Sequence, residues 1–311
     1  MVKITYVKNG VTKDDMEIIM HAIPILEKFS ATGFRVTLRQ LYYQFVTRNL
    51  FPNSDKMYKK LCRSIRRGRM AGLIDWDAIE DRTRSLRFRS RWENLTDILH
   101  TCSQQFHVDH WINQRSRVEL WFEKDAVIGV VERTCREWDC PYFSCRGYSS
   151  ISELHEAAQR IKEYNNSGQR CKILYCGDHD PSGLNMCDSI KQNLTTFGAV
   201  FKFESIALNI EQIDFFNLPP NPVKKSDTRS DAYCKLYGDE CWELDALSPQ
   251  ALNDIIESAI INCIDDMSDF DARRAEDVAG RKQLGLVGKH FNNAHHYVKN
   301  YLVLLYQLTL T

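Results

Sequence analysis

The sequence predicts an α/β protein in which a helical N-terminal domain precedes a parallel-sheet domain and a helical C-terminal extension. Two patterns predict this class. Apolar residues recur at helical spacing through the first hundred residues, whereas after Val118 short runs rich in β-branched and aromatic residues alternate with helical segments. The boundaries that follow are residues 1–95 for the helical domain, 96–116 for a linker, 117–255 for the sheet domain and 256–311 for the extension.

Three helices are expected in the N-terminal domain. The first covers residues 16–29, and Thr37 is a good N-cap for a second over residues 38–46. After a break, Ser54 or Asp55 caps a third helix that ends near residue 70, and residues 71–74 indicate the entry into a wing. Helix, turn and basic helix in this order match a helix-turn-helix, whose last helix enters the DNA major groove.

The third helix carries a high density of positive charge. Between residues 56 and 69 there are seven basic residues and no acidic one. Such a block favours DNA phosphates as its partner, with a solvated amphipathic helix as the alternative. A second basic cluster follows at Arg82, Arg84, Arg87, Arg89 and Arg91. The residues expected to contact DNA are Lys59, Lys60, Arg63, Arg66, Arg67 and Arg69.

Composition and charge exclude several classes of protein for this chain. The 41 basic and 41 acidic side chains give a formal net charge of zero, which excludes a uniformly basic nucleic-acid binder but not a locally basic one. No apolar run approaches the roughly 18–20 residues that cross a bilayer, and the N-terminus lacks a signal-peptide pattern. The 11 cysteines include no Cys-x-x-Cys pair, which favours free thiols over a structural zinc. We therefore expect a cytoplasmic, nucleoid-associated protein without a membrane partner.

Carboxylates follow two of the predicted strands at the edge where parallel strands end. Glu123 comes directly after the strand over residues 118–122, and Asp178 and Asp180 follow the strand over residues 172–176. Functional groups collect at such strand ends, and alternate residues of an extended segment point the same way. Carboxylate oxygens around a position open to phosphate are what Mg²⁺ prefers. The sequence therefore predicts a magnesium site at these three residues, with a solvated strand-end loop as the alternative.

Two further segments near these acids are candidates. His179 lies between the two aspartates and either contacts a phosphate or acts as a spacer. The segment 242–247, which contains Glu243 and Asp245, either brings a further carboxylate near the metal or supplies an acid at a helix start. The helix dipole favours the second interpretation.

Three of these features together resemble a known family. Glu123, Gly147 and the segment Gly177-Asp178-His179-Asp180-Pro181-Ser182-Gly183 resemble the signature positions of a Toprim domain, the fold of topoisomerases, primases and some nucleases. The Asp-x-Asp-Pro-x-Gly form is most similar to the A subunit of topoisomerase VI and its relative, the meiotic double-strand-break protein. In that group a winged-helix domain precedes the Toprim domain, and the resemblance covers roughly residues 20–250. It implies that the three acids hold Mg²⁺ and that Gly147 is a backbone requirement at a tight turn.

The same resemblance implies a tyrosine nucleophile on the winged-helix domain. The family has an Arg-x-x-Tyr-Tyr-like segment, which matches Arg39 to Tyr43, so that Tyr43 is the nucleophile and Arg39 its helper. A helical projection independently assigns Tyr42 to the core and predicts that Tyr43 is presented. A guanidinium one turn away would favour the phenolate, whose ordinary pKa is about 10, and clamp the phosphate. The alternative is a tyrosine that only hydrogen-bonds near bound DNA.

These features predict magnesium-dependent cleavage of double-stranded DNA through a phosphotyrosine link. Two other functions stay open: a hydrolytic Toprim nuclease of the defence type that does not use Tyr43, and a DNA-binding regulator without catalysis. A tyrosine and a metal site on different domains imply a homodimer in which two chains assemble each cut. The sequence contains neither a Walker P-loop nor ATP-lid glycines, so any ATP-driven strand passage would need a separate ATPase subunit.

Overall fold

A computed structural model of the chain describes residues 3, 5–7, 10–79, 90–146, 149 and 151–308. The chain forms two compact units. Unit 1 combines Met1–Ser85 with Arg115–Cys263, and unit 2 combines Leu86–Gln114 with Ile264–Thr311. The predicted metal, tyrosine and DNA-contact residues all belong to unit 1.

Unit 1 is built around a parallel sheet of four strands in the order β2-β1-β3-β4. Its strands are β1 (Ser116–Phe122), β2 (Tyr142–Ser144), β3 (Arg170–Cys176) and β4 (Phe201–Ala207). The two central strands start and end together, because Ser116 pairs with Arg170 and Phe122 pairs with Cys176. The α/β class predicted from alternating strands and helices is confirmed.

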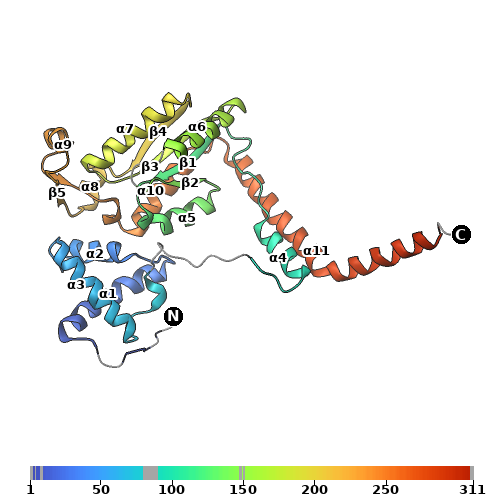
Figure 1. Cartoon of the computed structure of the whole chain (residues 1–311), viewed down its shortest axis with the longest axis horizontal. Coiled ribbons are helices and arrows are strands. Elements are labelled where there is room, and N and C mark those ends of the chain that lie inside the picture. Colours follow the sequence, from blue (N-terminus) through green and yellow to red (C-terminus); the bar gives the residue numbers. More distant parts are fainter. Residues whose placement is uncertain are drawn as a thin grey trace. The chain divides into compact units, whose positions relative to one another are not determined.

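Helices cover both faces of this sheet (Figure 1). They are α6 (Ile151–Asn166) and α7 (Pro181–Thr196) on one face, and α5 (Ile128–Glu137) and α10 (Pro249–Ile261) on the other. Trp121, Ile173 and Tyr175 project from the central strands into the core beneath α6 and α7. Strands covered on both faces are mostly apolar, as the second halves of β1 and β3 are here.

Three helices make up the N-terminal part of unit 1: α1 (Lys13–Ala31), α2 (Leu38–Thr47) and α3 (Asp55–Met70). The predicted N-caps are confirmed. Thr37 accepts a hydrogen bond from the Gln40 backbone N–H while the Gln40 side chain accepts one from Thr37, and Ser54 caps α3. Ile19 and Ile65, both buried, belong to the core of this helical part.

The predicted wing is only partly within the described residues. Residues 71–74 form turns that lead into the 3-10 helix η1 (Trp76–Ala78), and Ile79 makes one parallel bridge to Val36. No β-hairpin forms among the described residues between 71 and 79. The continuation of the segment lies outside the described residues, together with Arg82, Arg84, Arg87 and Arg89.

The chain after β4 forms small elements that return to the C-terminal edge of the sheet. They are α8 (Ile210–Phe216), β5 (Asn221–Pro222), α9 (Ser230–Tyr237), β6 (Glu240–Cys241) and η3 (Leu244–Ala246). The backbones of His179 and Trp242 exchange hydrogen bonds of 2.9 and 3.0 Å. This pairing brings residues 242–245 beside the loop that follows β3.

Unit 2 consists of α4 (Leu95–Gln105) packed along the long helix α11 (Met267–Leu308). Asp277 of α11 is buried and accepts a hydrogen bond of 2.7 Å from the Val108 backbone N–H. Helix α11 forms most of the predicted helical extension over residues 256–311. Across the described part of the chain, no helix combines the length and apolar composition that crossing a bilayer requires.

Candidate functional site

The C-terminal ends of β1 and β3 bring two of the predicted carboxylates together. Glu123 directly follows β1, and its backbone N–H donates to the carbonyl of Cys176, the last residue of β3, at 2.9 Å. Its side-chain Oε2 accepts a hydrogen bond of 2.9 Å from the Asp178 backbone N–H. Both residues are buried. The common register of the two strands therefore positions Glu123 against Asp178.

The third predicted ligand, Asp180, is the N-cap of α7. Its Oδ1 accepts a hydrogen bond of 2.6 Å from the Gly183 backbone N–H, and Pro181 occupies the first turn of the helix. A Cβ at Gly183 would collide with the Asp178 carbonyl oxygen and lie 3.2 Å from Glu123 Oε2. Gly183 thus lies against all three predicted ligand residues, and a side chain at this position would not fit.

A lysine lies among further carboxylates on the same edge. Lys124 Nζ is 2.6 Å from Asp178 Oδ2, 3.0 Å from Glu243 Oε2 and 3.8 Å from Asp245 Oδ1. Between the two added acids, the Leu244 backbone N–H donates to Asp178 Oδ1 at 2.8 Å. Glu243 is the N-cap residue of η3 and Asp245 lies in its first turn, as the helix-start interpretation expects, although Glu243 makes no capping hydrogen bond. The segment 243–245 belongs to the acidic site.

Burial and mutual repulsion set the charges of these groups. Burial, reinforced by repulsion from Asp178, raises the pKa of Glu123 to about 7. Burial also raises the pKa of Asp245 to about 7, although Lys124 opposes the shift. For Lys124, burial would lower the pKa, but attraction to Asp245, Asp178 and Glu243 outweighs it and raises the pKa above its ordinary value. Lys124 therefore carries a stable positive charge, whereas Glu123 and Asp245 titrate near neutral pH.

The predicted nucleophile and its helper approach this cluster from α2. Arg39 forms an ion pair with Glu243 Oε1, and its guanidinium also donates to the Tyr43 hydroxyl at 3.5 Å. Asn221 of β5 donates to the same hydroxyl at 3.1 Å. A continuous series of contacts thus leads from Tyr43 through Arg39, Glu243 and Lys124 to Asp178, at the edge of the sheet where the metal site is predicted.

The prediction that Tyr43 is presented to solvent is wrong. Tyr42 and Tyr43 are 2% and 1% exposed, so both are core residues. Burial raises the pKa of Tyr43 above its ordinary value, repulsion from Glu243 adds to the rise, and attraction to Arg39 does not offset them. Burial therefore outweighs the effect of Arg39 on the pKa of Tyr43, although Arg39 favours the phenolate as expected.

The basic residues of α3 divide into paired and exposed groups. Lys60 lies 3.5 Å from Asp14 and Arg67 lies 2.7 Å from Asp15, so α1 supplies counterions that the sequence pattern did not reveal. Arg69 donates to the backbone of η1. Within the described residues, the exposed cations without an acidic partner on this helix are Lys56, Lys59, Arg63 and Arg66. Three of these, with Cys62, line an open hollow of about 690 Å³.

His179 is a spacer in the acidic loop rather than a group that faces it. It is buried, its Nδ1 lies 2.8 Å from the Tyr233 hydroxyl, and its ring packs in a T-shaped geometry against Tyr237. Together with its backbone pairing to Trp242, these contacts hold the segment 242–245 in place. Gly147, the predicted backbone requirement, lies outside the described residues.

No protein-family model, curated protein or solved structure matches this chain.

The donor set at the edge of the sheet fits Mg²⁺ chemically. Glu123, Asp178 and Asp180 supply hard carboxylate oxygens, and Asp245 adds a buried Oδ1 that has no hydrogen-bond partner. Two of these ligands already have one oxygen bound to a backbone N–H, Glu123 Oε2 to Asp178 and Asp180 Oδ1 to Gly183. An ion here would reach some of them through water, as Mg²⁺ commonly does. The magnesium site stays a prediction.

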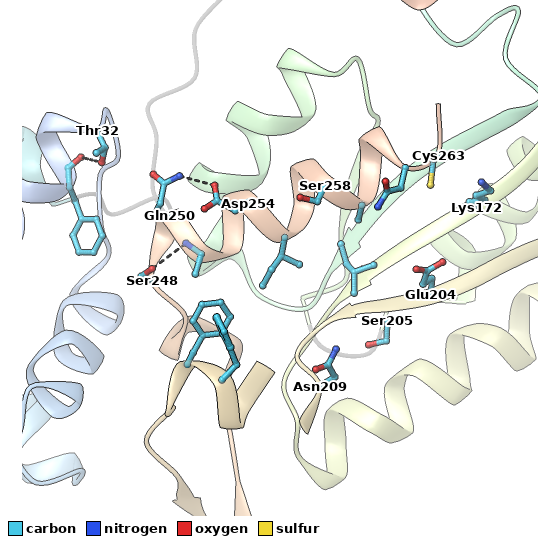
Figure 2. Close-up of a pocket in the computed structure, with 18 of the residues that line it drawn as sticks. Thr32, Lys172, Glu204, Ser205, Asn209, Ser248, Gln250, Asp254, Ser258 and Cys263 are labelled. Atoms are coloured by element: carbon cyan, nitrogen blue, oxygen red, sulfur yellow. Dashed lines mark hydrogen bonds between the residues drawn. The ribbon is translucent and has the colours of Figure 1, made fainter. Parts of the chain in front are cut away.

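A separate cavity of about 1100 Å³ opens beside α10 and the edge strand β4 (Figure 2). Four of its charged and polar groups pair with one another, since Gln250 donates to Asp254 at 2.7 Å and Lys202 pairs with Glu204 at 3.0 Å. None of the predicted metal-site, tyrosine or DNA-contact residues lines this cavity. The chemistry predicted from the sequence therefore lies elsewhere, at the C-terminal edge of β1 and β3.

Sequence reasoning missed two residues of the site. Lys124 is adjacent to Glu123, and a basic residue among strand-end acids was the available signal for it. Asn221 contacts Tyr43 across 178 positions of sequence, and no pattern in the sequence links the two.

Proposed function

We propose that this chain cleaves double-stranded DNA with the help of Mg²⁺, using Tyr43 as the nucleophile that forms a phosphotyrosine link. The observation that carries the proposal is the position of Arg39, which contacts both the Tyr43 hydroxyl and Glu243. Glu243 shares Lys124 with Asp178, so the tyrosine and the strand-end acids belong to one charged network. A tyrosine that only packs in the core would not require a chain of charged residues between its hydroxyl and the strand-end acids.

The basic face of α3 supports DNA as the substrate. The Arg39 guanidinium lies 5.3 Å from the ring centroid of Tyr58, which is the residue before Lys59 on α3. The exposed cations Lys56, Lys59 and Arg63 therefore lie on the same helix as Tyr58, the residue that Arg39 contacts. A phosphate backbone held by these cations would pass close to Arg39.

The resemblance noted in the sequence adds to this proposal. A helical module followed by a parallel sheet with acids on its central strands has the order of the winged-helix and Toprim domains in the A subunit of topoisomerase VI. Glu123, Asp178 and Asp180 match the acids that hold Mg²⁺ in that family. We infer a type IIB A-subunit-like protein, which would need a separate ATPase subunit for any strand passage.

The proposed reaction is a reversible transfer of a phosphodiester. The Tyr43 oxygen bonds to phosphorus and gives its proton to water, the bond from phosphorus to the sugar oxygen breaks, and that sugar oxygen takes a proton from water. Arg39 holds a non-bridging phosphate oxygen, and Lys124 keeps Asp178 oriented. A bound Mg²⁺ would neutralise the scissile phosphate and stabilise charge on the leaving oxygen. Reversal of these steps reseals the strand.

Tyr43 has to leave its buried position before it can reach a phosphate. Its hydroxyl is held by Asn221, and its side chain is 1% exposed. This burial is also the observation that favours the second candidate function, in which water hydrolyses the phosphodiester at the acidic site and Tyr43 is dispensable. A catalytically silent DNA-binding regulator is the third.

One assay separates the three functions. Protein is incubated with supercoiled plasmid and Mg²⁺, denatured with detergent, and the DNA is tested for covalently attached protein. We expect an adduct that is lost in Tyr43→Phe and Asp178→Asn but kept in Tyr42→Phe, the matched control on the same helix. Free nicked DNA from Tyr43→Phe would establish hydrolysis instead. Binding without any cleavage would leave the regulator.

A further inference from the structure

The side chain of Lys124 is surrounded by carboxylates in a way that a metal ion usually is. Its ammonium contacts Asp178 Oδ2 at 2.6 Å and Glu243 Oε2 at 3.0 Å, with Asp245 Oδ1 at 3.8 Å. These three acids come from the loop after β3 and from the segment around η3. An ammonium has three donors and no acceptor, which suits a position between several carboxylates.

Asp245 supplies the second observation. This residue is 2% exposed, and its Oδ1 makes no hydrogen bond. A buried, unpartnered carboxylate oxygen is costly unless a cation compensates it. Lys124 compensates it only at 3.8 Å, so the oxygen is directed toward the compartment that the ammonium occupies.

The carboxylates of the site therefore form two groups, and Asp178 contacts both, one through its side chain and the other through its backbone N–H. The first holds the Lys124 ammonium against Asp178, Glu243 and Asp245. The second consists of Glu123 and Asp180, each of which has one oxygen bound to a backbone N–H. Their remaining oxygens, Glu123 Oε1 and Asp180 Oδ2, accept no hydrogen bond from the residues that the structure describes.

We propose that Lys124 is a built-in replacement for a second metal ion, so that this chain binds one divalent cation and not a pair. The inference rests on the proposed metal site and goes beyond it by fixing its stoichiometry. A phosphate at the site then meets one metal ion on the Glu123 and Asp180 side and an ammonium on the Glu243 and Asp245 side. Lys124 acts as a positioning residue for Asp178.

The test counts bound Mn²⁺ per chain from the electron paramagnetic resonance of the free ion. We expect one ion for the native chain and for Lys124→Arg, which keeps the charge. Lys124→Met should bind two, because the emptied compartment retains Asp178, Glu243 and Asp245. The double variant Lys124→Met/Asp245→Asn should return to one. Lys191→Met, which removes an exposed lysine of α7 paired with Asp188, is the matched control and should bind one.

Each outcome bears on the proposal separately from the proposed function. Two ions in the native chain, or one in a folded Lys124→Met, would overturn the role of Lys124 while leaving the metal site standing. No ion in any variant would overturn both the metal site and this inference. If Lys124→Met fails to fold, the number of ions bound to the native chain still tests the proposal, because two ions would overturn it. Melting temperatures of Lys124→Arg with and without Mn²⁺ then show whether this variant binds the ion as the native chain does.

Discussion

Arg39 on α2 and Glu243 beside η3 form an ion pair between two segments separated by 204 positions of sequence. Because Arg39 also contacts Tyr43 and Glu243 also contacts Lys124, this pair joins the tyrosine to the acids that follow β1 and β3. The contact lies within one chain. A tyrosine and a metal site on different domains predict that each site is assembled from two chains, whereas this ion pair favours assembly within one chain, and the two can be tested against each other.

Mixing two inactive variants tests which chain supplies each half of the site. If Tyr43 works with the acids of its own chain, Tyr43→Phe mixed with Asp178→Asn should remain inactive in plasmid cleavage, because each chain lacks one half. If the halves come from two chains, a mixed dimer regains one complete site and cleavage returns. Refolding the two variants together ensures that subunits exchange, and native chain treated in the same way is the control.

Gly183→Ala should weaken divalent-cation binding without unfolding unit 1. The new Cβ would collide with the Asp178 carbonyl and press on Glu123 Oε2 from 3.2 Å, so both groups must move. Displacing groups that orient ligands costs about 10- to 100-fold in metal affinity. Titration with Mn²⁺ measures the loss. Gly285→Ala, where a Cβ meets no heavy atom within 4 Å, should bind as the native chain does.

Local signals in the sequence predicted the elements of unit 1 that depend on nearby residues. Thr37 and Ser54 cap α2 and α3 because their side chains bond to backbone N–H groups three residues away. The position of Glu123 beside Asp178 also followed from the sequence, since parallel strands of similar length end at one edge. These parts of the fold and of the site can be predicted without knowing which distant residues are in contact.

The parts that sequence reasoning missed depend on distant contacts. A helical projection ranks the faces of α2 by their own residues, and it could not detect that Asn221 of β5 covers Tyr43. The block of positive charge on α3 likewise gave no sign that Asp14 and Asp15 of α1 neutralise two of its members. Glu243 was an open candidate for the same reason, because its partners Arg39 and Lys124 come from two other elements.

The metal-free protein should lose stability as the pH rises toward neutrality. Burial, followed by repulsion from Asp178, raises the pKa of Glu123 from 4.5 to about 7 in the folded state. A raised folded pKa contributes stability that is present below pH 4.5 and lost as the pH rises through about 7. Mg²⁺ should reverse this loss, because it stabilises the ionised form. Melting temperatures with and without Mg²⁺ should therefore diverge between pH 5 and 8. A constant difference across that range would contradict the role of Glu123.

Asp15→Asn should destabilise the packing of α1 against α3. Its carboxylate accepts hydrogen bonds of 2.7 Å from Ser64 and from Arg67, and weakening such charged contacts costs about 1.5–3 kcal/mol. Burial would raise the pKa of Asp15, but the hydrogen bonds from Thr12, Ser64 and Arg67 outweigh it and lower the pKa below its ordinary value. This contribution is therefore present above that ordinary value and lost in acid. Urea unfolding at neutral and acidic pH measures it, and Asp14→Asn, an exposed neighbour, should change stability by less than about 1 kcal/mol.

Single substitutions of the exposed cations on α3 should lower the salt dependence of DNA binding. Lys59→Ala, Arg63→Ala and Arg66→Ala each remove a charge without an acidic partner among the described residues, so each should reduce the slope of log affinity against log salt by about one. Arg67→Ala should destabilise unit 1 as well, because Arg67 is the partner of Asp15. Fluorescence anisotropy with a labelled duplex at several salt concentrations gives the slopes. Lys191→Ala on α7 is the control and should leave the slope unchanged. If the three exposed positions also leave it unchanged, α3 does not contact the phosphates, and the proposed role of this helix in DNA binding fails.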